Sequence, residues 1–269
     1  MKLLKIIGIA IPLIIITAGL SYPDSLIMYT LKKNYGGFLQ DVTHVKEKEN
    51  QFQYVLYNDL KETDVTHMTS FLESNYQRIL QDLNVSSLPL VTVRIWKNYE
   101  DFHQEQENSL GQRYIGSMGY ITWAKQPELK LMYREGDDGA ISMVHEFAHI
   151  ASLAINSTIA NNPRWLWEAI AIYEAGKLKV PPSQIEYIAA RDFPTIEELS
   201  IGYNRDGEER NIYQVGYVLG EFIDSKWGAG TLSALIKSNG NIQETLKVPV
   251  PEFEASWHKF IQNKYLTEK

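Results

Sequence analysis

The stretch VHEFAHIASL, residues 144–153, places two of the chain's six histidines four positions apart, with a glutamate directly after the first. In a helix, positions i and i+4 lie on one face, so His145 and His149 would project side by side within reach of one ion. Glu146 would sit about 100° round the helix and lean over the open side of that ion. The spacing predicts a catalytic metal site with two histidine ligands and a glutamate base.

A third ligand is expected on a second helix. The apolar spacing predicts helices at about 139–155 and 163–177, and within the second Pro163 suits the first turn while Gly176 can end the helix. Glu168 lies on that helix, close to alanines that would allow tight packing against the first helix. A glutamate on such a face is costly unless something pairs it, and a metal cation would do so.

The pattern H-E-x-x-H, eighteen further residues and a glutamate, with W-L-x-E leading into the second helix, resembles the gluzincin zinc metallopeptidases. Its spacing is similar to that of the M1-like aminopeptidase branch and of bacterial peptidase-MA-like domains. The resemblance implies a thermolysin-like catalytic core holding one Zn²⁺ per chain, with His145, His149 and Glu168 as ligands and Glu146 as general base and acid. The alternative is two surface histidines and a buried glutamate that is paired elsewhere.

A second matching stretch is YQVGYVLGEFI, residues 213–223. The resemblance implies that Tyr213, in a Y-x-x-G pattern with Gly216, donates a hydrogen bond to the developing oxyanion. A neutral donor aimed at that new negative charge stabilises the transition state. Tyr217, four residues further on, could take this role instead.

The stretch GSMGY, which begins at Gly116, departs from the aminopeptidase pattern. Aminopeptidases of this type carry G-x-M-E-N on an edge strand, and its glutamate holds the free amine of the substrate. Here Gly119 stands in the place of that glutamate. Gly116, Met118 and Gly119 stay candidates for substrate binding through backbone hydrogen bonds. Without the amine anchor, an endopeptidase is expected rather than an aminopeptidase.

The remaining pattern predicts an α+β fold: a small mixed β-sheet with helices, followed by a mostly helical half over 178–269. Strand patterns occur in QFQYVLY, LPLVTVRIW, MGYITW and LKLMY, and residues 63–84 have helical spacing. The metallopeptidase-like domain is expected over residues 51–269, with its active-site helices at about 139–177. Residues 26–50, with NYGG and KEKEN, are expected to be a linker.

Residues 1–25 are typical of an export signal, because Lys2 and Lys5 precede an uncharged apolar run from Ile6 to Leu20. The run is long for a signal peptide and short for a membrane span, so its cleavage stays open. With no clean small-residue cleavage site, an uncleaved anchor is favoured. The lysines would then stay in the cytoplasm, with the catalytic domain outside it at the cell membrane, or secreted if the segment is cleaved.

The composition excludes several classes of site. The chain has 269 residues, a net charge of −7 and no cysteine, so it has no disulfide, cysteine zinc site or cysteine nucleophile. No basic stripe is present, and nucleic acid is not an expected partner.

Together these features predict an extracytoplasmic zinc endopeptidase that acts on peptide or protein substrates. The alternative is a non-catalytic, zinc-containing binding or sensor module at the cell surface, although such a module needs ligands and no base. Glu174, six positions past Glu168, is expected to point away from the ligand face and to be exposed.

Overall fold

The computed structural model describes the backbone of residues 42–48. It also describes residues 51–176, 178, 180–201 and 211–266. The predicted signal anchor at residues 1–25 lies outside the described residues. Within the described ranges, no helix combines the length and the apolar character that crossing a membrane requires.

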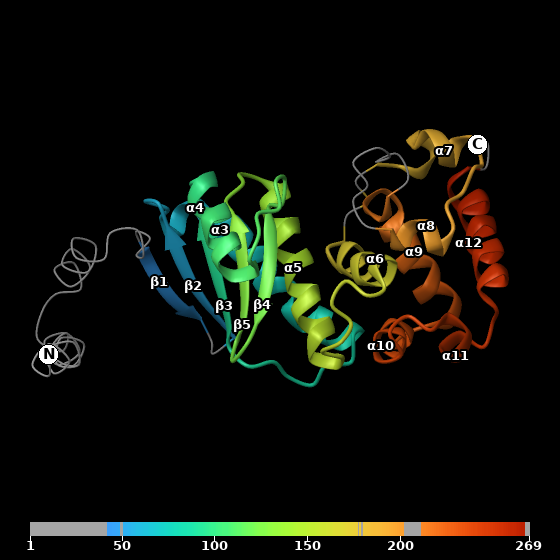
Figure 1. Cartoon of the computed structure of the whole chain (residues 1–269), viewed down its shortest axis with the longest axis horizontal. Helices are drawn as coiled ribbons and strands as arrows, with labels where there is room; N and C mark the ends of the chain where they lie inside the picture. The colour runs from blue at the N-terminus through green and yellow to red at the C-terminus, as the bar shows by residue number, and fades with distance from the viewer. Residues whose placement is uncertain (1–41, 49–50, 177, 179, 202–210, 267–269) are drawn as a thin grey trace, which may run out of the picture. The chain divides into compact units, whose positions relative to one another are not determined.

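A mixed sheet of five strands, in the order β1-β2-β3-β5-β4, carries the N-terminal part of the described chain (Figure 1). Its strands are β1 (Val42–Lys48), β2 (Phe52–Tyr57), β3 (Val91–Trp96), β4 (Gly119–Trp123) and β5 (Pro127–Met132). The central pairs β2–β3 and β3–β5 are parallel, whereas β1–β2 and β4–β5 are antiparallel. Strand β4 therefore forms one edge of the sheet.

Helices account for most of the remaining described residues. They are α3 (Glu62–Asp82), α4 (Tyr99–Leu110), α5 (Asp137–Ile155), α6 (Arg164–Glu174), α7 (Glu186–Ala189), α8 (Ile196–Ser200), α9 (Ile212–Trp227), α10 (Thr231–Lys237), α11 (Ile242–Leu246) and α12 (Val250–Tyr265), with a 3₁₀ turn, η1 (Pro182–Gln184). The predicted α+β class with a small mixed sheet is confirmed.

The two faces of the sheet are covered by different helices. Alternation along β3 sends Val93 and Ile95 into the main core, where Phe147 of α5 and Met68 of α3 are also buried. On the opposite face, Trp96 packs with Phe102 of α4 in a smaller cluster. Helix α5, which carries the H-E-x-x-H motif, thus lies directly on the sheet and is buried along most of its length.

Two glycines let helix α9 approach helix α6 closely. A Cβ atom at Gly216 would lie 2.7 Å from Cδ1 of Ile172 and 3.2 Å from Cα of Ala169. A Cβ atom at Gly220 would lie 2.5 Å from Cβ of Tyr173. The glycine of the Y-x-x-G pattern is thus needed for packing. Because it has no side chain, α6 can lie close to α9, which brings the start of α9 towards the candidate site.

The structure differs from the predictions mainly where segments are short or at an edge. Residues 42–48, expected within a linker, form strand β1 instead. Their run of charged residues hides the strand signal, because edge strands commonly carry charge that blocks further pairing. The short helices α8 and α11 were not predicted, since five residues are too few to display helical periodicity.

Candidate metal centre

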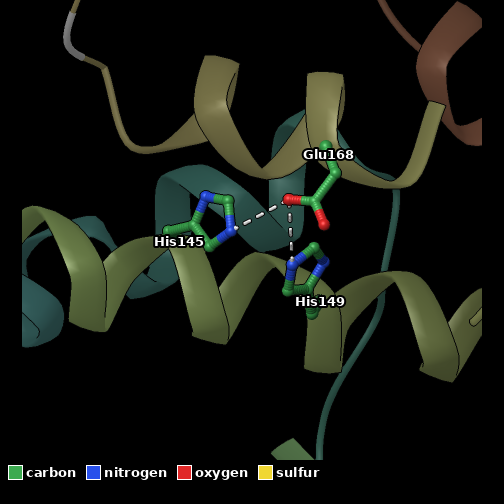
Figure 2. Close-up of side chains that lie close together, drawn as sticks. All are labelled: His145, His149 and Glu168. Carbon is green, nitrogen blue, oxygen red and sulfur yellow. Dashed lines mark ion pairs between the residues drawn. The ribbon is translucent and has the colours of Figure 1, made fainter. Parts of the chain in front are cut away.

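His145 and His149 of α5 converge with Glu168 of α6 (Figure 2). Oε2 of Glu168 lies 3.4 Å from Nε2 of His145 and 3.9 Å from Nε2 of His149. One ligand atom from each of the three residues lies within 4.8 Å of the others. The predicted i, i+4 pair and the glutamate from the second helix are therefore brought together by the packing of α5 against α6.

The aromatic ring of Trp167 packs flat against one of the candidate ligands. The indole stacks on the imidazole of His149 with ring centroids 4.0 Å apart and an interplanar angle of 7°. His149 is buried, and its Nδ1 atom has no hydrogen-bond partner among the described residues. Stacking thus does what a hydrogen bond to Nδ1 commonly does for a metal-binding histidine.

Burial and mutual proximity set the protonation states of His149 and Glu168. Burial, together with His145, lowers the pKa of His149 well below its ordinary value, so this imidazole is neutral at pH 7. Burial alone would raise the pKa of Glu168, but His145, His149 and Arg164 together outweigh it and hold the pKa low, so this carboxylate is ionised. A neutral imidazole and an ionised carboxylate are the forms that bind a metal.

Glu146 lies between the ligand pair and the edge strand β4. A Cβ atom at Gly119 would lie 2.8 Å from both Cγ and Oε1 of Glu146, so the glutamate side chain occupies the space that a side chain at Gly119 would need. Burial raises the pKa of Glu146 to about 7, the negative charge of Glu168 adds to the rise, and His145 opposes it. This carboxylate can therefore exchange protons near neutral pH.

Tyr213 lies beside the ligands at the start of α9. Its ring centroid is 6.5 Å from that of His145. Nη2 of Arg164 donates a hydrogen bond of 3.3 Å to the tyrosine hydroxyl, and the guanidinium carbon lies 5.5 Å from the ring centroid. Tyr217, the alternative candidate, packs against Tyr173 away from this group.

The candidate substrate-binding residues lie at the start of β4 and just before it. The carbonyl oxygen of Met118 accepts a hydrogen bond of 2.9 Å from the amide of Met132, so it is already used in the sheet. Gly116 has a φ of +90° and no atom near the position of a Cβ. At Gly119, a Cβ atom would lie against the side chain of Glu146.

The expectation for Glu174 was wrong. Its side chain is fully buried rather than exposed, and Nη1 of Arg78 lies 2.7 Å from its Oε2 atom. Helical spacing correctly turns Glu174 away from Glu168, but it cannot reveal that the side chain of Arg78, on α3, reaches this carboxylate.

Sequence reasoning also missed Arg164 and the contribution of Trp167. Arg164 lies one helical turn before Glu168, so the i, i+4 relation on α6 could have placed it on the ligand face. Trp167, expected to be a packing residue, stacks on the candidate ligand His149. Stacking between helices has no signal in a single sequence.

The residues present fit a divalent cation. Oε2 of Glu168 is buried without a hydrogen-bond partner among the described residues, and burying an ionised oxygen in this way is costly unless a cation is close. Two imidazoles and one carboxylate form a donor set that suits Zn²⁺, and three protein ligands leave a fourth position open. No family model matches the chain, and neither does any curated protein.

Proposed function

We propose that the chain is a zinc-dependent metallopeptidase with a gluzincin-type catalytic core, and that it hydrolyses internal peptide bonds. The observation that carries the proposal is the convergence of His145, His149 and Glu168 within 4.8 Å, with Glu146 alongside. Structural zinc sites are usually closed by four protein ligands, whereas catalytic sites keep a position free. A site with three ligands and a neighbouring carboxylate is thus better suited to catalysis than to structure.

In this proposal Glu146 is the group that moves protons. With a pKa near 7, its carboxylate can accept a proton from the attacking water and return it to the leaving amine. Bound zinc would supply Lewis acidity for the scissile carbonyl and lower the pKa of water. Tyr213, held by Arg164, is the candidate donor to the oxyanion.

Gly119 supports an endopeptidase. At the point where β4 passes Glu146, the strand has no side chain and therefore no carboxylate to hold a substrate's terminal amine. We further propose that residues 1–25 anchor the protein in the cell membrane, or direct its secretion, with the catalytic domain outside the cytoplasm.

The test is cleavage of an unbiased peptide mixture by the full-length protein in nonionic detergent, read by mass spectrometry. Wild type is compared with Glu146→Gln and with Glu252→Gln, a matched change at an exposed glutamate on α12. Zinc content is measured for all three proteins. Internal cleavage by wild type and Glu252→Gln, but not by zinc-loaded Glu146→Gln, supports the proposal. Stoichiometric zinc without cleavage in any protein would favour the binding or sensor module instead.

A further inference from the structure

Arg164 stands at a place where a positive charge is locally unfavourable. It is the first residue of helix α6, and the first turn of that helix contains no acidic residue. The N-terminal end of a helix carries partial positive charge, so a cation there is destabilising. A side chain that breaks a local rule of stability beside a candidate site is itself a candidate for function.

Arg164 is not the counter-ion of Glu168, although it lies one helical turn before it on α6. Within the described part of the chain, the ion pairs of Glu168 are with Nε2 of His145, at 3.4 Å, and with Nε2 of His149, at 3.9 Å. Balancing the charge of that carboxylate therefore does not account for the position of the guanidinium.

The half-buried guanidinium contacts Tyr213 in two ways. Nη2 donates a hydrogen bond of 3.3 Å to the tyrosine hydroxyl, and the guanidinium carbon lies 5.5 Å from the centre of the ring, within the range of a cation–π contact. Nη1 lies 3.5 Å from Oδ1 of Asn161, just before α6. Arg164 thus contacts both the ring and the hydroxyl of one side chain, and that side chain is the candidate donor to the oxyanion.

The hydrogen bond between Arg164 and Tyr213 can have only one direction. A guanidinium has N–H donors and no acceptor, so the hydroxyl oxygen must accept. The single hydrogen of a tyrosine hydroxyl takes no part in this bond, and repulsion from the guanidinium turns it to another side of the oxygen. A hydroxyl that accepts a hydrogen bond is polarised by it and becomes a stronger donor.

We propose that Arg164 is a positioning residue for peptide hydrolysis: by donating to the Tyr213 hydroxyl, it sets the direction of the hydroxyl hydrogen and strengthens its donation to the oxyanion. This inference rests on the proposed function and adds to it how the tyrosine is prepared for its role. A donor that is oriented before the negative charge develops needs no reorganisation in the transition state. Loss of Arg164 should therefore lower kcat and leave KM nearly unchanged.

The test is a double-mutant cycle between Arg164 and Tyr213, made with the full-length, zinc-loaded protein in nonionic detergent. The rate constants kcat and KM are measured for wild type, Arg164→Met, Tyr213→Phe and the double variant, on a peptide that wild type cleaves. Arg164→Met is expected to lower kcat about tenfold in the wild-type background and by less than about twofold in the Tyr213→Phe background. Arg191→Met, at an exposed arginine between α7 and α8, is the matched control and should behave as wild type.

Two further replacements separate the direction of the hydrogen bond from the bulk of the side chain. Arg164→Lys keeps the charge and carries donors only, so it should recover at least part of the kcat that Arg164→Met loses. Arg164→Gln keeps an N–H donor, but its amide oxygen can also accept from the tyrosine hydroxyl. The direction is then no longer fixed, and this variant should resemble Arg164→Met.

A second readout does not depend on turnover. In protein labelled with ¹³Cζ-tyrosine, the NMR signal of Tyr213 is the one that Tyr213→Phe removes. That signal is expected to shift in Arg164→Met and to stay in place in Arg191→Met. Zinc content is measured for every variant and should stay near one per chain.

Several results would overturn the inference. Equal fold losses in kcat from Arg164→Met in the two backgrounds would show that Arg164 acts without Tyr213. An unmoved Tyr213 signal in Arg164→Met, or loss of zinc from that variant, would do the same; if it does not fold, Arg164→Gln takes its place. No cleavage by folded, zinc-loaded wild type would overturn the proposed function as well, whereas cleavage with equal losses in both backgrounds would leave the proposed function standing.

Discussion

Gly119 packs directly against the Glu146 carboxylate: a Cβ atom at Gly119 would lie 2.8 Å from Cγ and from Oε1 of that glutamate. The same Cβ would lie 2.8 Å from Cδ2 of Leu131, on the neighbouring strand β5. Because real Cβ atoms almost never approach so closely, a methyl group at this position must move something. The glutamate is the partner whose displacement affects chemistry.

Gly119→Ala is therefore expected to move Glu146 and to lower the rate of peptide hydrolysis about 10²-fold, while zinc content stays near one per chain. The measurement is kcat and bound zinc for the variant beside Ile121→Val, a mild change on the same strand. Full activity in the Gly119→Ala variant would show that the precise position of Glu146 does not matter.

The stacking of Trp167 on His149 leads to a prediction about metal affinity. Trp167→Leu removes the flat surface that orients the imidazole, and zinc affinity is expected to fall about tenfold or more, the usual effect of losing a group that supports a ligand. Trp167→Phe keeps a ring and should retain most of the affinity. Competition with a chromophoric chelator measures both values. Equal loss in the two variants would mean that the indole contributes bulk rather than orientation.

Tyr213 and Tyr217 form a matched pair for testing the oxyanion donor. Tyr213→Phe removes the hydroxyl near the ligands, and kcat is expected to fall about 10²-fold with KM nearly unchanged. Tyr217→Phe changes a residue that packs against Tyr173 instead, and it should leave kcat within a few-fold of wild type. If instead Tyr217→Phe carried the larger loss in kcat, the assignment of Tyr213 would be wrong.

The raised pKa of Glu174 predicts that the stability of the fold depends on pH. Burial raises its pKa from 4.5 to about 7, so the folded state binds this proton more tightly than the unfolded state. The contribution of Glu174 to stability is therefore fully present below pH 4.5 and is lost as pH rises to about 7.

Glu174→Gln removes this titration. The free energy of unfolding of wild type relative to the variant is expected to fall by on the order of 3 kcal/mol between about pH 4.5 and about pH 7. Urea denaturation of both proteins at several pH values gives the difference, in which other titrating groups largely cancel. A difference that does not change with pH, or that grows, would contradict the raised pKa.

The close contact between Gly216 and helix α6 can be tested by adding and removing single methyl groups. Gly216→Ala forces a Cβ to within 2.7 Å of Cδ1 of Ile172, and a loss of about 1–3 kcal/mol in the free energy of unfolding is expected. Ile172→Val deletes that Cδ1 atom, so the double variant should recover part of the loss. If the changes in unfolding free energy of the two single variants simply add in the double variant, the added methyl group does not clash with Ile172. The clash would then lie elsewhere, for example with Ala169.

Much of the fold, and the convergence of the three candidate ligands, could be predicted from the sequence, because both rest on local periodicity. The i, i+4 spacing put His145 and His149 on one face, and the second amphipathic segment carried Glu168. Strand β1 could not be predicted, because its sequence is rich in charged residues. Such residues are common on edge strands but lack the apolar pattern by which a strand is recognised.

What sequence reasoning missed depends on packing between elements far apart in the chain. Arg78 reaches Glu174 across 96 residues, and nothing near either residue signals the pair. The contacts of Arg164 with Tyr213, and of Gly119 with Glu146, likewise join different elements. Such contacts determine how deeply a side chain is buried and how its pKa shifts, and the pattern of a single sequence gives no information about them.

The central claim is that His145, His149 and Glu168 hold one zinc ion with a position left open. Its most direct test is an anomalous difference map at the zinc edge from crystals of the full-length protein. We predict a single strong peak at about 2.0–2.2 Å from Nε2 of both histidines and from a carboxylate oxygen of Glu168, with no fourth protein ligand. Absence of a peak there, or a fourth protein ligand that closes the site, would contradict the account.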